Sequence, residues 1–78
     1  MSAEYFREVK KIIEEKTGVD PSDILMDSCF EDDLNVGEME IIEILSELEE
    51  KYDITLMENR ENLETVQDLV ELLSEKIE

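Results

Sequence analysis

Apolar side chains recur every three or four residues in three stretches of the chain, and this spacing restricts the fold more than any other feature. In the middle stretch the repeat consists of Ile41, Ile44, Leu45, Leu48 and Tyr52. Residues at these intervals lie on one face of an α-helix, because a helix has about 3.6 residues per turn. The sequence therefore predicts an amphipathic helix that buries this face.

The first and last stretches carry the same helical pattern. The apolar positions are Phe6, Val9, Ile12 and Ile13 in the first stretch, and Val66, Leu69, Val70, Leu73 and Ile77 in the last. A helix from about Ala3 to Thr17 is predicted, with Gly18 at the left-handed position where helices commonly end. Thr65, followed three residues later by Asp68, is typical of a helix N-cap.

The segment between the first two helices reads as a long loop that ends near Val36. Pro21 suits the first position of a short turn, and four apolar side chains are expected to anchor the loop: Ile24, Leu25, Phe30 and Leu34. Residues 57–63 are predicted to form one weak helical turn. We therefore expect an all-α four-helix bundle, with three main helices, one short helix and a long loop between helices one and two.

Size and charge exclude several classes of function. The 78 residues contain 24 acids and 7 bases, which gives a formal net charge of −17. A chain of this length is expected to form a single domain, residues 1–78, and to be a monomer. Its negative field repels nucleic acid and anionic membranes but attracts cations and basic protein surfaces.

The chain has one cysteine, Cys29, and no histidine. One cysteine cannot form an intramolecular disulfide, and the N-terminal stretch lacks the apolar run of a signal peptide, so we predict a cytoplasmic protein. Cys29 has two interpretations, a reactive thiol or a small side chain packed beside Phe30. We favour the second, because no histidine can act as a base and the nearby acids raise a thiol pKa.

The segment from Phe30 to Asp53 resembles the central part of an acyl carrier protein. The residues that carry the resemblance are Asp33, Leu34, Glu43, Glu49, Glu50, Tyr52 and Asp53. It extends to residues 9–13, 18–19 and 65–67, and so to nearly the whole chain. The resemblance implies an acyl-carrier-protein-like bundle.

In that family a serine at the start of the second helix carries 4'-phosphopantetheine. Glu38 stands at this position, Gly37 replaces the preceding aspartate and Met39 replaces the following leucine. Glutamate cannot form the phosphodiester, so the sequence predicts a chain with no cofactor. A chain this small, with no histidine and no evident apolar pocket beyond the bundle, also offers no catalytic residues, so we predict that it is not an enzyme. An acyl chain without a tether would have to lie between the helices, against Ile41, Ile44 and Leu69.

Glu38 itself has two interpretations. The run Asn35-Val36-Gly37-Glu38 has the spacing of a capping box, which would place Asn35 at the N-cap and Glu38 at the third helical position. Asn35 also tolerates the left-handed backbone conformation that a glycine has there in the family. Alternatively, Glu38 preserves at the helix N-terminus the negative charge that a phosphodiester would place there.

The resemblance also implies a protein-docking role in fatty acid or polyketide biosynthesis, because the second helix of the family binds basic patches on acyl-chain enzymes. The residues that we predict to bind such partners are Glu38, Met39, Glu40, Ile42, Glu43, Glu47, Glu49 and Glu50. One alternative is a purely structural bundle with a solvated acidic face.

A second alternative is cation binding by residues 27–38, which have the length and several of the acids of an EF-hand loop. Cys29 is a soft ligand at the third position, however, and Asp32 replaces the glycine that makes the sharp turn at the sixth. The sequence therefore predicts no specific metal site.

Overall fold

The computed structural model describes residues 2–78, and it is built from helices. The main helices are α1 (Ser2–Thr17), α2 (Glu38–Tyr52) and α3 (Val66–Ile77), and two short 3-10 helices are η1 (Pro21–Asp23) and η2 (Met57–Asn62). The described residues contain no strand, only one isolated bridge between Cys29 and Thr65. The predicted all-α fold, with three main helices, a short helix and a long loop after the first, is therefore confirmed.

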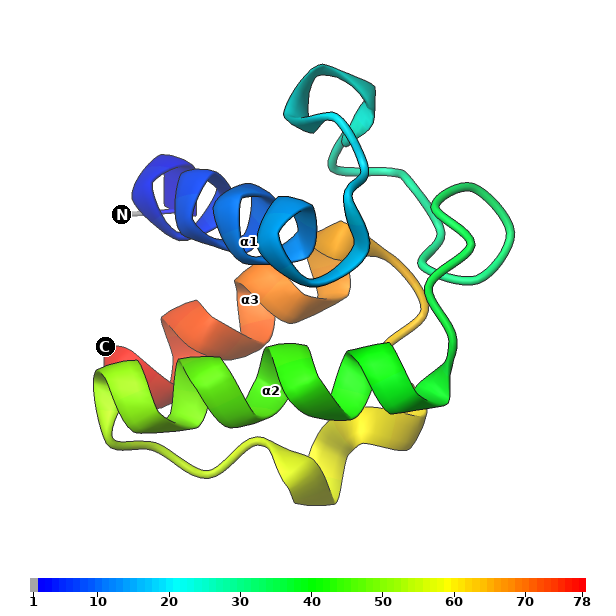
Figure 1. Ribbon diagram of the computed structural model, residues 1–78. Coiled ribbons are helices and arrows are strands. Elements are labelled where there is room, and N and C mark those ends of the chain that lie inside the picture. The colour runs from blue at the N-terminus through cyan, green and yellow to red at the C-terminus, as the bar shows by residue number, and fades with distance from the viewer. Residues whose placement is uncertain (1) are drawn as a thin grey trace.

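The helices surround one core (Figure 1). Helix α1 packs against both α3 and α2, while η2 packs on α2, and the start of α1 and the end of α3 lie on the same side of the bundle. Buried residues come from the three helices, the long loop and the segment before η2: Val9, Ile12, Ile13, Ile24, Phe30, Leu34, Val36, Ile44, Leu45, Leu48, Leu56, Val66, Leu69, Val70 and Leu73. Within residues 2–78, no helix is long and apolar enough to cross a membrane.

The predicted buried positions are confirmed with two exceptions: Leu25 in the loop, and Ile77 at the end of α3, which is 36% exposed. Ile44, Leu45 and Leu48 of α2 are fully buried, and Ile41 and Tyr52 pack partly buried against the same core. In the loop, Ile24, Phe30 and Leu34 are buried as expected, but Leu25 is 58% exposed. The prediction for Leu25 was wrong because Ile24 and Leu25 are adjacent in extended chain, where successive side chains point in opposite directions.

Local capping signals end α1 and begin α3 as the sequence predicts. Gly18 has a φ of +81°, and its N–H donates to the carbonyl of Glu14 at 2.9 Å. At α3, Thr65 Oγ1 accepts a hydrogen bond from the Asp68 N–H at 3.2 Å, and Asp68 Oδ2 accepts one from the Thr65 N–H at 3.1 Å. This reciprocal capping box fixes where α3 begins.

The long loop is held against the start of α3 by backbone hydrogen bonds. The Phe30 N–H donates to the carbonyl of Glu64 at 3.0 Å, the Val66 N–H to that of Ser28 at 3.0 Å, and the Gln67 N–H to that of Met26 at 2.8 Å. The amides of Val66 and Gln67 belong to the first turn of α3, where no helical carbonyl is available to them. The loop thus supplies the acceptors that the helix lacks.

Candidate functional site

The start of α2 differs from the predicted capping box. Asn35 has the expected left-handed backbone, with φ +55°, but the N-cap is Gly37, and Glu38 is the first helical residue. The carboxylate that reaches back belongs to Glu40, whose Oε1 accepts from the Gly37 N–H at 3.1 Å. The prediction was wrong because Val36 is buried and donates its N–H to the carbonyl of Phe30 at 2.7 Å. This contact keeps Val36 in the loop, so the N-cap lies two residues later than predicted.

Glu38 is exposed at the N-terminus of α2. Its carboxylate forms no hydrogen bond or ion pair with any other residue in the range 2–78. The first turn of a helix leaves N–H groups unpaired and carries a partial positive charge. Glu38 therefore places one negative charge at this helix end and leaves it available to solvent or to a partner.

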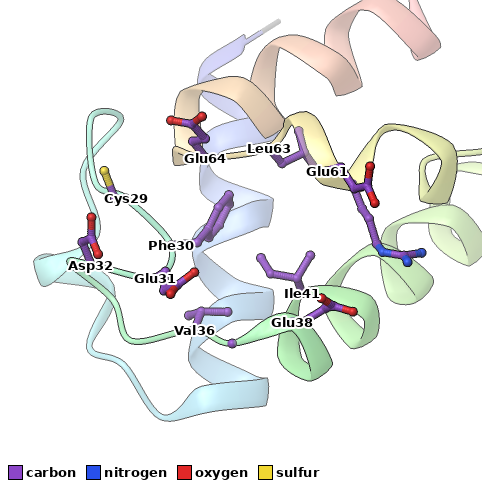
Figure 2. Close-up of a pocket in the computed structure, with 12 residues that line it drawn as sticks. Cys29, Phe30, Glu31, Asp32, Val36, Glu38, Ile41, Glu61, Leu63 and Glu64 are labelled. Atoms are coloured by element: carbon purple, nitrogen blue, oxygen red, sulfur yellow. The ribbon is translucent and has the colours of Figure 1, made fainter.

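A cleft of about 460 Å³ opens beside Glu38, between the long loop, the start of α2 and the segment around η2 (Figure 2). It is lined by Cys29, Phe30, Glu31, Asp32, Val36, Gly37, Glu38, Ile41, Arg60, Glu61, Leu63 and Glu64. Four of these side chains are apolar, five are carboxylates and one is a guanidinium. None of the lining residues is a serine, threonine or tyrosine, so this cleft offers no hydroxyl group.

Only one of the three residues expected to line an acyl chain borders this cleft. Ile41 is at its edge, whereas Ile44 and Leu69 have no exposed surface and form part of the packed core. The sequence also missed the residues that η2 and its flank contribute, among them Arg60 and Leu63. No local pattern marks them, because they reach the cleft only through the packing of η2 on α2.

The acidic residues of α2 fall into two groups. Glu43 and Glu50 are exposed and make no ion pair or hydrogen bond with the residues from 2 to 78. Glu47, in contrast, pairs with Lys16 of α1, with 3.3 Å between Lys16 Nζ and Glu47 Oε1. Glu49 is half-buried, and its Oε2 accepts from the backbone N–H groups of Leu56 at 2.6 Å and Met57 at 3.1 Å.

Glu49 and Glu40 therefore hold the fold together as well as adding negative charge. Glu49 fixes the connection from α2 into η2, and Glu40 closes the first turn of α2. The apolar members of the predicted set lie beside the unpaired acids. Met39 is 74% exposed, and Ile42 is half-buried.

Residues 27–38 do not have the geometry of an EF-hand. The helix before them, η1, is only three residues long, and Asp33 turns its Oδ2 back to accept from the Cys29 N–H at 2.7 Å. An EF-hand loop lies between two full helices and directs its carboxylates toward one centre. Among the described residues, no group of three or more cysteine and acidic side chains could hold a metal ion.

Cys29 is partly buried, and the pKa of its thiol is raised. Desolvation is the largest cause, followed by the negative charges of Asp33 and Asp32. Both effects disfavour the thiolate, which is the nucleophilic form. The surroundings of Cys29 therefore disfavour a reactive thiol.

We expect Cys29 to react with iodoacetamide more slowly than a cysteine in a short peptide. Its reaction rate should rise with pH, and the midpoint, the pH at which the rate is half-maximal, should be higher than for the peptide cysteine. Asp33→Asn removes a charge that raises the thiol pKa, so it should lower the midpoint. Asp27→Asn is the control, because Asp27 is not among the groups that shift this thiol. Mass spectrometry of alkylation against pH measures each midpoint, and a wild-type midpoint at or below the peptide's would contradict the assignment.

A three-helix core with a fourth short helix, a long first connection and a charged cleft at the start of α2 defines a small carrier-type domain. The family model described as "Phosphopantetheine attachment site" matches residues 7–73. The chain is 37% identical over 71 residues to an acyl carrier protein of Exiguobacterium sibiricum, a match that covers 90% of each chain. It is 39% identical over 69 residues to an acyl carrier protein of Bdellovibrio bacteriovorus, covering 87% of this chain and 88% of that one.

The chain therefore belongs to the acyl carrier protein family. The fold agrees with a solved structure, described as the apo doublet acyl carrier protein from prodigiosin biosynthesis, with a TM-score of 0.83 at 19% identity. That match covers 96% of this chain but only 37% of the other. Acyl carrier proteins are carrier proteins, not enzymes.

Proposed function

We propose that this chain is a member of the acyl carrier protein family that is not phosphopantetheinylated and acts by docking to other proteins. The observation that carries the proposal is Glu38, a carboxylate at the first position of α2, beside a cleft without a hydroxyl group. A carboxylate cannot form the phosphodiester that a serine forms. Its charge at the helix N-terminus nonetheless resembles that of a phosphodiester, which partners of the family would meet at this place.

None of the three serines between the end of α1 and the end of α2, Ser22, Ser28 and Ser46, has the position that the prosthetic group needs. Ser28 is 6% exposed, and its Oγ accepts from the Leu25 N–H at 2.9 Å. Ser22 lies in η1 and donates its hydroxyl to Asp20 at 2.8 Å. Ser46 lies inside α2, two turns beyond the helix start. The residues present therefore do not fit 4'-phosphopantetheine.

The proposed docking face consists of Glu38, Met39, Ile42, Glu43 and Glu50. The three acids make no ion pair or hydrogen bond with residues 2–78, so a partner would not have to break an existing interaction to reach them. Met39 is 74% exposed and supplies an apolar contact. An apolar anchor surrounded by charges is the usual composition of a binding hot spot and its rim.

The remaining predicted residues contribute indirectly. Glu40, Glu47 and Glu49 keep their negative charge while they bond within the protein, so they add to the field of α2 without being free to bind. A basic surface on an enzyme of fatty acid or polyketide biosynthesis is the partner that this face fits best. We propose that the protein meets such enzymes as a monomer in the cytoplasm.

A pair of charge-reversal variants tests the docking face. Glu43→Lys with Glu50→Lys changes the net charge as much as Glu71→Lys with Glu75→Lys, which alters exposed positions of α3. If α2 is the recognised surface, the first variant should weaken binding to a purified ketoacyl synthase or acyltransferase at least about tenfold, or ~1.4 kcal/mol. The second should weaken it about threefold or less, because distant charges act mainly on the association rate.

Met39→Ala provides a further readout of the same surface. Loss of a desolvated apolar anchor is expected to cost more than about 1 kcal/mol of binding free energy. The protein should stay folded, since Met39 is exposed and lies outside the core. Titration calorimetry measures all the affinities. Equal losses from the two charge pairs, together with no effect of Met39→Ala, would leave the purely structural bundle as the better description.

A further inference from the structure

The cleft beside Glu38 has a composition that the docking face does not explain. Met39, Ile42, Glu43 and Glu50 are not among its lining residues, so only Glu38 belongs to both. Its volume of about 460 Å³ lies within the range of roughly 300–1,000 Å³ that is typical of small-molecule sites. The cleft is therefore large enough to hold a small molecule.

The floor of the cleft is apolar. Phe30, Val36, Ile41 and Leu63 line it, and Figure 2 shows Phe30, Leu63 and Ile41 grouped near its middle. Phe30 and Val36 are nearly fully buried, so they present only a small part of their surface to the cleft, whereas Ile41 and Leu63 are half-buried. An alkyl chain laid across these residues would remove apolar surface from water, which is favourable in proportion to the area covered.

Carboxylates surround this floor. Glu31, Glu38 and Glu61 lie around Ile41 and Leu63 in Figure 2, and Asp32 and Glu64 complete the lining. None of the five makes an ion pair within residues 2–78. A cleft lined mainly by one sign of charge concentrates ions of the opposite sign.

Arg60 is the single cation of the lining, and it too makes no ion pair with the residues described. Five carboxylates against one guanidinium give the cleft a negative field, which repels the carboxylate of a free fatty acid. We infer that the cleft binds a small amphiphilic cation, an ammonium group on a short alkyl chain, with the chain on the apolar floor and the ammonium among the carboxylates.

Hexylammonium chloride is the probe, with hexanol and sodium hexanoate as probes of equal chain length. Titration into the isotopically labelled protein at low ionic strength should give saturable amide shifts at Phe30, Val36, Ile41 and Leu63 with hexylammonium. Hexanol should bind at least about tenfold more weakly, because the field of the cleft does not attract it. Hexanoate should give no saturable shifts.

Matched variants separate this cleft from the general acidity of the protein. Glu38→Gln with Glu61→Gln should weaken hexylammonium binding about tenfold, whereas Glu14→Gln with Glu15→Gln removes the same charge from the exposed side of α1 and should change it less than about twofold. Arg60→Gln should strengthen hexylammonium binding. Unchanged amide shifts in α3, which carries none of the substitutions, confirm that each variant is folded.

Three results would overturn the inference. Tighter binding of hexanoate than of hexylammonium would mean that Arg60 determines the ligand. Equal losses of hexylammonium affinity in the Glu38→Gln, Glu61→Gln variant and the Glu14→Gln, Glu15→Gln variant would mean that the cation only accumulates around an acidic protein. Amide shifts spread evenly over the surface would mean the same. Saturable binding of a lysine-containing peptide without binding of hexylammonium would assign the cleft to a partner protein. The docking face is tested separately at Glu43, Glu50 and Met39, which do not line the cleft.

Discussion

Incubation with coenzyme A and a broad-specificity phosphopantetheinyl transferase is expected to leave the mass of the wild-type chain unchanged. The transferase needs a serine hydroxyl at the start of the second helix, and α2 begins with Glu38. Ser28 is buried and Ser46 lies inside the helix. Intact-mass spectrometry measures the outcome directly, and a labelled serine anywhere in the wild type would contradict the proposed loss of the carrier function.

Glu38→Ser combined with Gly37→Asp should gain one phosphopantetheine group in the same assay. Position 37 is the N-cap of α2, where aspartate is among the preferred residues. A Cβ atom there would meet only Glu40 Oε1, at 3.1 Å, and this flexible carboxylate can move away. Glu38→Ala with Gly37→Asp is the control, since it restores the cap without a hydroxyl. A folded serine variant that stays unmodified would mean that the transferase no longer recognises this surface.

Phe30→Ala should remove a large part of the stability of the whole protein, although Phe30 belongs to a loop. Its side chain is 3% exposed and packs in the main core. Truncation of a buried phenylalanine costs about 3–5 kcal/mol, whereas a chain of this size has a total stability of roughly 4–12 kcal/mol. Leu25→Ala is the control in the same loop, because Leu25 is 58% exposed and such changes usually stay within about 0.5 kcal/mol.

Urea unfolding followed by circular dichroism measures both variants. The midpoint should fall strongly for Phe30→Ala and hardly at all for Leu25→Ala, with an unchanged slope if the native state remains compact. Equal midpoints for the two variants would mean that the loop can detach from the bundle without cost. In that case the cleft, which Phe30 also lines, could not be a preformed site.

The helices could be predicted because their signals are local. The apolar spacing in α1, α2 and α3, Gly18 after α1 and the Thr65–Asp68 pair before α3 each act within a few residues of chain. The prediction of α1 from Ala3 to Thr17 differs by one residue from the observed start at Ser2. Helix ends commonly differ by that much between assignments.

The errors occurred where distant segments decide the outcome. The capping box was placed at Asn35 because its spacing fits, yet the burial of Val36 in the core starts α2 at Glu38. Glu49 belongs to the acidic stripe of α2, but the sequence does not show that its carboxylate also accepts hydrogen bonds from the Leu56 and Met57 backbone, seven and eight residues away. The cleft could not be predicted at all, since it exists only where the loop, α2 and η2 meet.

The hydrogen bonds between the loop and the start of α3 join segments that are far apart in the sequence. Ser28 and Phe30 pair with Val66 and Glu64, so the whole of α2 and η2 lies between the partners in the sequence. Closing so long a stretch of chain loses entropy before any bond is gained. The helices, whose contacts are local, should therefore form first and the loop should dock late. The amide protons of Phe30 and Val66 should accordingly exchange together, as one cooperative unit of opening.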